Sequence, residues 1–181
     1  MKNLSTYKTM NKITTIGNTQ TGHHYWVGHV SKEKECFAGQ TFKSPQVGAL
    51  KSISIFPEII VGEAEVVLSV YEFDTATYEW KEKKAESQLQ LNNTMEKQWV
   101  CFELTNIVLD NSKQYAFKIS CNNGGMMAIA ESHWKEKNIY KDGEQWIASS
   151  ENPKGAFHRN FDLSFIASIE NTWPISTPLK K

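Results

Sequence analysis

Aromatic and hydrogen-bonding side chains gather in one stretch of the sequence, between residues 122 and 159. Proteins hold a sugar by stacking flat aromatic rings on its C–H face and by giving its hydroxyls directional hydrogen bonds. The stretch supplies both kinds of group, which predicts a non-catalytic carbohydrate-binding site. The candidate ligand-binding residues are Trp134, Tyr140, Trp146, Asn123, Glu131, His133 and Arg159, the single arginine of the chain.

Catalytic motifs are absent from the sequence. There is no G-x-S-x-G elbow of a serine hydrolase, no GxxxxGK[ST] phosphate loop and no GxGxxG turn. Glycoside hydrolysis needs two carboxylates that meet in space, and the twenty acidic residues offer many chance pairs. We therefore expect no enzymatic activity. The alternative left open is that two of four carboxylates meet in space as a glycosidase pair; the candidates are Glu72, Asp74, Glu103 and Glu131.

The histidines do not predict a metal site. In the segment HHYWVGH, His24 and His29 point to opposite faces of a strand. His23 and His29 share a face but lie about 20 Å apart along an extended chain. Zinc needs three or four converging ligands, so we expect no metal cofactor. A structural calcium ion on loop oxygens stays open as an alternative, with candidate ligands at Asp110, Asn111 and Asp142.

Three cysteines, Cys36, Cys101 and Cys121, are an odd number at wide spacing. This excludes a complete disulfide framework and a CxxC metal knuckle. Cys101 and Cys121 each fall in an alternating segment, so they are expected to be buried free thiols. One disulfide between them is the alternative.

The charge and hydrophobic composition of this 181-residue chain argues against nucleic acid and membranes as partners. Lysine plus arginine and aspartate plus glutamate both number 20, so the net charge is zero. No charge excess attracts the chain to nucleic acid or to an anionic membrane surface. No apolar run approaches the roughly 20 residues of a membrane helix. The first residues also lack the apolar segment of a secretory signal, so the chain as given is expected to have no export address.

Period-two alternation of apolar and polar residues is the strongest structural signal. It places successive side chains on opposite faces of a strand and recurs along most of the chain. With little helical periodicity, many short strands predict an all-β, two-sheet antiparallel sandwich of the jelly-roll type. Strands are expected near residues 24–30, 37–42, 49–56, 64–73, 88–91, 98–104, 113–121, 126–131, 144–148 and 161–169.

The ends and one internal segment break this pattern. Residues 1–20 are expected to be a loose lead-in, 21–170 a single sandwich and 171–181 a tail with two prolines. The charged segment at 77–88 (TYEWKEKKAESQ) has no apolar stripe, which predicts a long polar hairpin excursion.

Three short motifs carry a resemblance to a known family. They are QTF at residues 40–42 followed by Pro45, LSVYE at 68–72 and DLSF at 162–165. In these pieces the run from Cys36 to Ile169 resembles bacterial jelly-roll modules attached to secreted and surface proteins. The resemblance implies a carbohydrate-binding domain outside the cell or on its surface.

Two alternatives accompany this resemblance. The family commonly uses an aromatic hairpin before its last strand, where Tyr140 and Trp146 would serve packing, while Trp134 stands in the polar loop SHWKEKN. The module could also be a structural or adhesin-type unit that binds a protein partner or itself through an exposed apolar patch.

Overall fold

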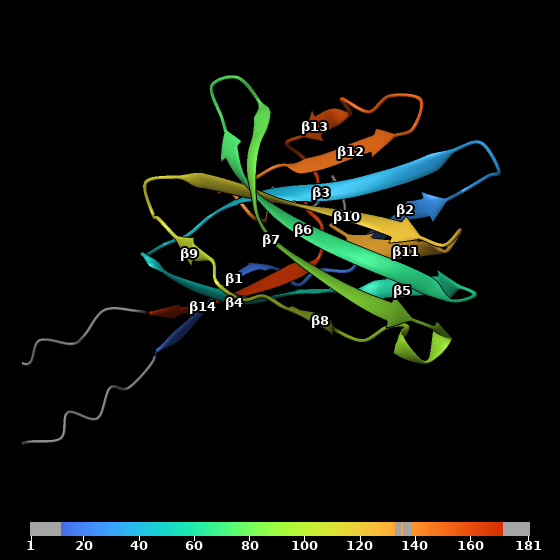
Figure 1. Cartoon of the computed structure of the whole chain (residues 1–181), viewed down its shortest axis with the longest axis horizontal. Coiled ribbons are helices and arrows are strands. Elements are labelled where there is room, and N and C mark those ends of the chain that lie inside the picture. Colours follow the sequence, from blue (N-terminus) through green and yellow to red (C-terminus); the bar gives the residue numbers. More distant parts are fainter. Residues whose placement is uncertain (1–11, 133–134, 136–138, 172–181) are drawn as a thin grey trace, which may run out of the picture.

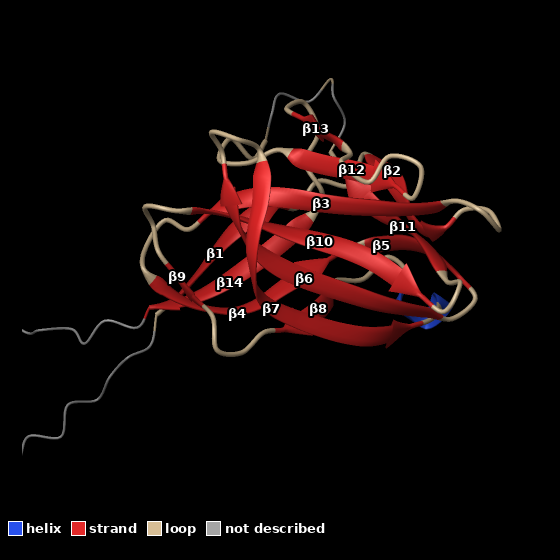
Figure 2. Ribbon diagram, turned by 45° about the horizontal axis from the view of Figure 1, so that its top comes forward, coloured by secondary structure: helices blue, strands red, loops and turns tan. Residues whose placement is uncertain are grey.

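The protein is a sandwich of two antiparallel sheets (Figures 1 and 2). The computed structural model describes residues 12–132, 135 and 139–171. The five-stranded sheet contains β1 (Ile13–Asn18), β14 (Phe165–Asn171), β4 (Gly48–Ile55) and β8 (Val100–Glu103), with β9 (Val108–Leu109) also paired to β4. The jelly-roll-like, all-β fold predicted from alternation is therefore confirmed.

The second sheet has nine strands. Its main path is β5 (Pro57–Val61), β11 (Met126–Glu131), β2 (His23–His29), β3 (Glu35–Lys43), β10 (Gln114–Asn122), β6 (Ala64–Asp74) and β7 (Glu79–Leu91). A hairpin of β12 (Gln145–Ser149) and β13 (Ala156–His158) is added where β12 pairs with β3. A single 3-10 turn, η1 (Asn93–Met95), lies between β7 and β8.

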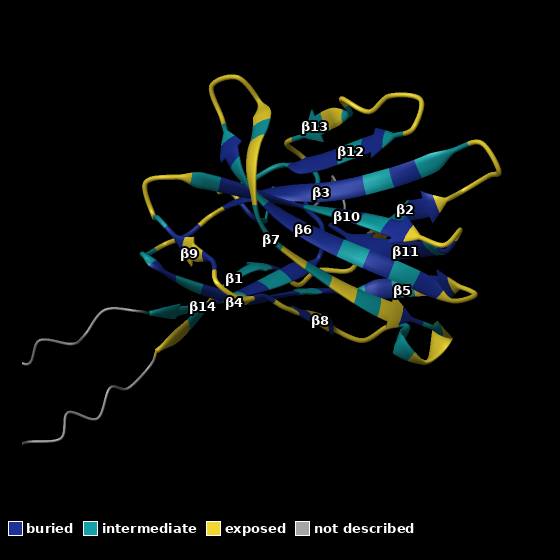
Figure 3. Cartoon of the chain, in the orientation of Figure 1, coloured by how far each residue is buried: buried dark blue, intermediate teal, exposed yellow. Residues whose placement is uncertain are grey.

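The alternating residues meet between the sheets. Phe165 from β14 packs against Phe42 of β3 and Phe117 of β10, with ring centroids 6.5 and 5.4 Å apart, and all three rings are fully buried. Figure 3 shows the buried residues following the strands through the middle of the molecule, while the turns are exposed. Burying each such side chain stabilises the fold by about 1.5–3 kcal/mol.

Each predicted strand segment falls on an observed strand, with shifted boundaries, but β1, β5, β9, β13 and most of β7 lie outside the predicted strands. The expected lead-in at 1–20 contains β1, which pairs with β14 from Ile13 opposite Glu170 to Asn18 opposite Phe165. The segment around Pro57 forms edge strand β5. The charged segment at 77–88 is the larger part of β7, the other edge of the nine-stranded sheet.

The cysteines are all free thiols, as expected. Cys36 and Cys121 are buried, but Cys101 is exposed, so the prediction of a buried Cys101 was wrong. Its neighbours Val100 and Phe102 take the core-facing positions of β8, which turns Cys101 to the other face. Among the described residues there is no helix long and apolar enough to cross a membrane.

Candidate ligand-binding groove

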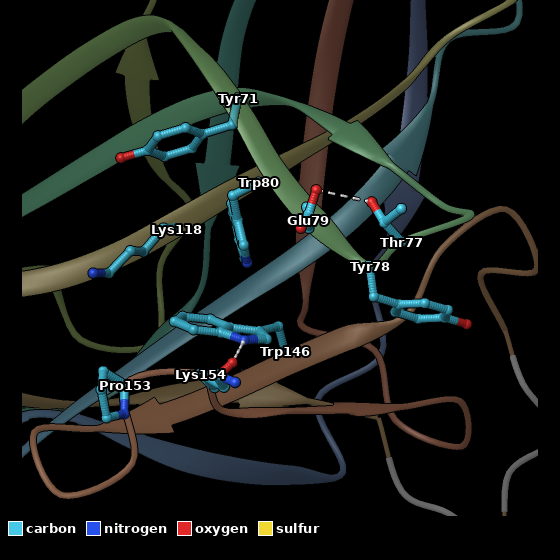
Figure 4. A pocket seen from close by; sticks show the side chains of 9 residues that line it. All are labelled: Tyr71, Thr77, Tyr78, Glu79, Trp80, Lys118, Trp146, Pro153 and Lys154. Atoms are coloured by element: carbon cyan, nitrogen blue, oxygen red, sulfur yellow. Dashed lines mark hydrogen bonds between the residues drawn. The ribbon is translucent and has the colours of Figure 1, made fainter.

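A groove of about 630 Å³ opens between two hairpins on the outer face of the nine-stranded sheet. One wall comes from the β6–β7 hairpin and the other from β12 and the turn that leads to β13 (Figure 4). The register between β6 and β7 shifts on both sides of Tyr71, and such bulges bend a strand pair. In Figure 1 the β6–β7 and β12–β13 hairpins rise on the same side of the molecule.

Two tryptophans meet across the groove. The Trp80 and Trp146 rings pack edge to face, with centroids 5.0 Å apart and an angle of 68° between their planes. Gly39 of β3 lies beneath both rings. A Cβ at this position would lie 3.1 Å from Trp80, 3.2 Å from Trp146 and 2.5 Å from the Phe117 carbonyl oxygen. The missing side chain at Gly39 therefore lets the two indoles meet above the sheet.

Trp146 is fixed from the side of its own hairpin. Its indole nitrogen donates a hydrogen bond of 2.9 Å to the Lys154 carbonyl, and the residue is only 4% exposed. Gly155 packs against the same ring with a φ of +64°, a conformation that glycine adopts without strain. Trp146 therefore forms the rigid inner wall of the groove.

Tyr71 and Trp80 form the more open wall. The Tyr71 ring meets the Trp80 ring edge on, with centroids 5.4 Å apart, and both residues are half-buried. Tyr78, at the tip of the same hairpin, is 42% exposed. Thr77 and Glu79 add polar groups beside these rings, and the Thr77 hydroxyl donates to Glu79 at 3.1 Å. The groove thus combines aromatic surface with hydrogen-bonding groups.

Arg159 lies at the rim of the groove and forms hydrogen bonds that link the β12–β13 side to the β6–β7 hairpin. Its guanidinium donates to Glu144 at 3.0 Å and to the Tyr78 hydroxyl at 3.2 Å. Tyr78 and Glu144 raise the pKa of the guanidinium, which stays charged. Tyr78 also packs on Phe157 of β13, with centroids 5.2 Å apart. These contacts hold the groove walls at a fixed separation.

Lys118 of β10 enters the groove from the floor. Its Nζ lies 4.1 Å from the centroid of the Phe37 ring and 5.9 Å from that of Trp146, close enough for cation–π attraction. Burial lowers the pKa of Lys118, and the more distant charge of Glu35 opposes this shift. The lysine is the charged group set deepest among the aromatic walls.

The structure separates the residues predicted as one site. Trp146 lines the groove and Arg159 lies at its rim. Tyr140 is 7% exposed and packs edge on against Phe165 between the sheets, so its ring is not free to stack on a ligand. His133 and Trp134 lie outside the described residues.

Two predicted polar residues also have other roles. Asn123 lies in the β10–β11 turn, where its amide donates to Glu65 at 3.0 Å. Glu131 is 8% exposed and accepts a hydrogen bond from the Gln145 amide. Burial raises the pKa of Glu131, while the Gln145 hydrogen bond and three histidines oppose the shift. Neither residue lines the groove.

Sequence reasoning missed the other half of the groove, namely Tyr71, Trp80 and Lys118. The available signal was Trp80 itself, an aromatic residue in an otherwise charged segment. Metal chemistry gains no support, since among the described residues no three His, Cys, Asp or Glu side chains converge on one point.

Comparisons with known proteins give the chain no family. No protein-family model matches it, and no curated protein matches it. Two solved structures of infectious bursal disease virus are similar, one of the VP2 subviral particle and one of the Gt strain. Both are 9% identical with a TM-score of 0.30, and they cover 94% and 97% of this chain but only 45% and 41% of theirs. The chain thus spans less than half the length of those proteins.

A likeness of this size supports neither a fold nor a function. The assignment of an all-β sandwich rests on the strand pairing itself. The resemblance to bacterial carbohydrate-binding modules finds no matching family among these comparisons.

Proposed function

We propose that this protein is a non-catalytic binding module that takes a glycan into the groove between the β6–β7 and β12–β13 hairpins. The observation that carries the proposal is the pair of half-buried rings, Tyr71 and Trp80, beside a groove of about 630 Å³. Ligand pockets in proteins have volumes of about 300–1,000 Å³. A groove of this size holds a short stretch of saccharide.

A sugar matches the groove better than a purely apolar ligand does. Each sugar ring has a C–H face that stacks on an indole or phenol ring and a rim of hydroxyls that needs partners. The groove sets Trp80 beside the carboxylate of Glu79 and the hydroxyl of Thr77. Both requirements are met within one site.

The experiment is glycan binding by the wild-type protein and three variants. We expect Kd values from micromolar to millimolar, as for a shallow site. Trp80→Ala and Tyr71→Ala should each weaken binding by about tenfold or more, equivalent to about 1.4 kcal/mol. Trp99→Ala is the control, since Trp99 is 37% exposed and packs on Phe56 rather than lining the groove. Equal affinities in all four proteins would refute the proposal.

Assembly through protein contacts is the second candidate. Its best surface is edge strand β5, where Ile59 and Val61 are 39% and 48% exposed. Two backbone groups of this edge are already bonded, because Ile60 N–H donates to Glu96 at 2.8 Å and Lys97 N–H to the Pro57 carbonyl at 2.7 Å. A further strand would have to displace both bonds, which favours the glycan proposal.

Sedimentation and substrate panels separate the remaining possibilities. A monomer at all concentrations, together with saturable glycan binding, fits the binding module. Self-association that Ile59→Asp abolishes, without any glycan bound, would instead favour assembly. Turnover of chromogenic glycosides or esters would show that the module is catalytic.

A further inference from the structure

Within the described residues, Lys118 differs from the lysines of β7 in having no carboxylate within ion-pair distance, although the charge of Glu35 acts on it from further away. The three lysines of β7 are paired with carboxylates, Lys81 with Glu79 at 2.6 Å, Lys83 with Glu86 at 2.9 Å and Lys84 with Glu72 at 3.6 Å. No carboxylate of the described residues lies within 4.0 Å of Lys118. Its neighbours are instead the rings of Phe37 and Trp146.

This position makes the ammonium group a strong attractor for an anion. Lys118 is half-buried, so water screens its charge less than it screens an exposed lysine. An anion placed beside it would supply the close partner that Glu35 does not, at a site where hydration has already been partly lost. Burial also lowers the pKa of Lys118, which an anionic ligand would reverse.

The other charges of the groove do not cancel this attraction. Glu79 is the carboxylate that lines the groove, and it is engaged by Lys81 and by the Thr77 hydroxyl. Lys154, an exposed residue on the opposite wall, adds a second positive charge and forms no ion pair within the described residues. The open charge of the groove is therefore positive.

We infer that the groove selects acidic saccharides, with Lys118 binding the carboxylate or sulfate of a sugar whose ring lies against Trp80 and Tyr71. The inference rests on the proposed glycan-binding function and names its ligand class. The aromatic walls would hold the C–H face of the sugar, while the ammonium group would bind the acidic substituent. A neutral sugar would leave Lys118 without an anion in direct contact.

The test is a glycan array that contains neutral, carboxylated and sulfated oligosaccharides. We expect the wild-type protein to bind mainly acidic glycans. Lys118→Met should weaken those signals about tenfold or more, whereas Lys51→Met should leave them unchanged. The control removes the same charge from the five-stranded sheet, where Lys51 pairs with Glu170 at 3.4 Å. Trp80→Ala should weaken all signals.

A ligand-side measurement covers the case in which Lys118→Met fails to fold. The strongest carboxylated glycan and its methyl ester, which differ only in charge, are titrated against the wild-type protein. We expect the ester to bind about tenfold more weakly or worse.

Failure of the acidic ligand class and failure of the proposed glycan binding give different results. If the protein binds neutral glycans through Trp80 and the ester binds as tightly as the acid, the acidic ligand class is wrong and the proposed function stands. If no glycan binds at all, the proposed function fails and the inference fails with it.

Discussion

Gln40 and Asp162 bind each other inside the sandwich, although 122 residues separate them in the sequence. The Gln40 amide donates to an Asp162 carboxylate oxygen at 2.9 Å, and its carbonyl accepts the Leu163 N–H at 2.9 Å. Asp162 also accepts from the Tyr140 N–H at 3.2 Å. The first and last of the three sequence motifs, QTF and DLSF, therefore form one buried joint between β3 and the segment that enters β14.

Breaking this joint should destabilise the protein. Gln40→Met keeps the side-chain volume. It leaves the Leu163 N–H unpaired and removes one hydrogen-bond donor to the buried Asp162 carboxylate. We expect a loss of about 2–4 kcal/mol in the free energy of unfolding, measured by urea denaturation. Gln88→Met, at an exposed position of β7, is the control. A change below about 0.5 kcal/mol for Gln40→Met would mean that the joint contributes little.

Glu131 gives stability a defined pH dependence. Burial raises the pKa of this carboxyl, so the folded state holds its proton at pH values where the unfolded chain, with a pKa of about 4.3, has lost it. The contribution of Glu131 to stability is therefore full below pH 4 and decreases as pH rises toward the folded-state pKa. Neighbouring charges from His23, His24 and His158 reduce the shift.

The variant Glu131→Gln isolates this effect. The stability of the variant relative to the wild-type protein should increase with pH above about 4, and then level off. Urea titrations at several pH values measure the difference. Glu33→Gln, which makes the same change at an exposed position, is the control variant. A relative stability of Glu131→Gln that falls with pH would mean that the shift has the opposite sign.

Gly39 should not tolerate a side chain. A Cβ there meets the Phe117 carbonyl oxygen at 2.5 Å and both groove tryptophans at just over 3 Å. Gly39→Ala should therefore cost about 1–3 kcal/mol and push Trp80 and Trp146 apart. Thermal denaturation and tryptophan fluorescence measure the two effects. An unchanged emission spectrum would show that the indoles do not depend on the glycine.

Thiol reactivity should distinguish the cysteines. Cys101 is exposed, whereas Cys36 is 8% and Cys121 0% exposed. Burial also raises the pKa of Cys121 to about 12, which suppresses the reactive thiolate. With a chromogenic disulfide reagent, the native protein should react at Cys101, and all three thiols should react in denaturant. The variant Cys101→Ser should leave the native protein unreactive. Rapid native reaction of that variant would contradict the assigned burial.

Strand periodicity predicted most of the fold because most strands have one buried face. In β10, Tyr115, Phe117 and Ile119 alternate with Ala116, Lys118 and Ser120, and this pattern identifies the strand although the small Ala116 interrupts the polar face. The charged segment of β7 was harder because an edge strand exposed over most of its length shows no apolar stripe. β5 was missed because it begins at Pro57, which sequence patterns associate with a turn.

The candidate site was only partly predictable for a different reason. Alternation places a side chain on a face but does not say which distant strands share that face. Trp146 and Trp80 lie 5.0 Å apart because β12 pairs with β3 and because the β6–β7 hairpin bends. Neither the β12–β3 pairing nor the bend of the β6–β7 hairpin can be inferred from a local stretch of sequence. Tyr140 belonged to the same aromatic stretch, yet its ring is in the core.

The pairing of β1 with β14 can form only after β14 has been synthesised. The Asn18 amide donates to the carbonyls of Asp162 and Leu163, 144 and 145 residues further along the chain. At ribosomal rates of about 5–20 residues per second, β1 waits roughly 7–30 s for its partner to be synthesised. During that interval the five-stranded sheet lacks both β14 and β1, since β1 joins it through β14, and β4 presents an open edge. The nascent chain is therefore more exposed to aggregation than the finished protein.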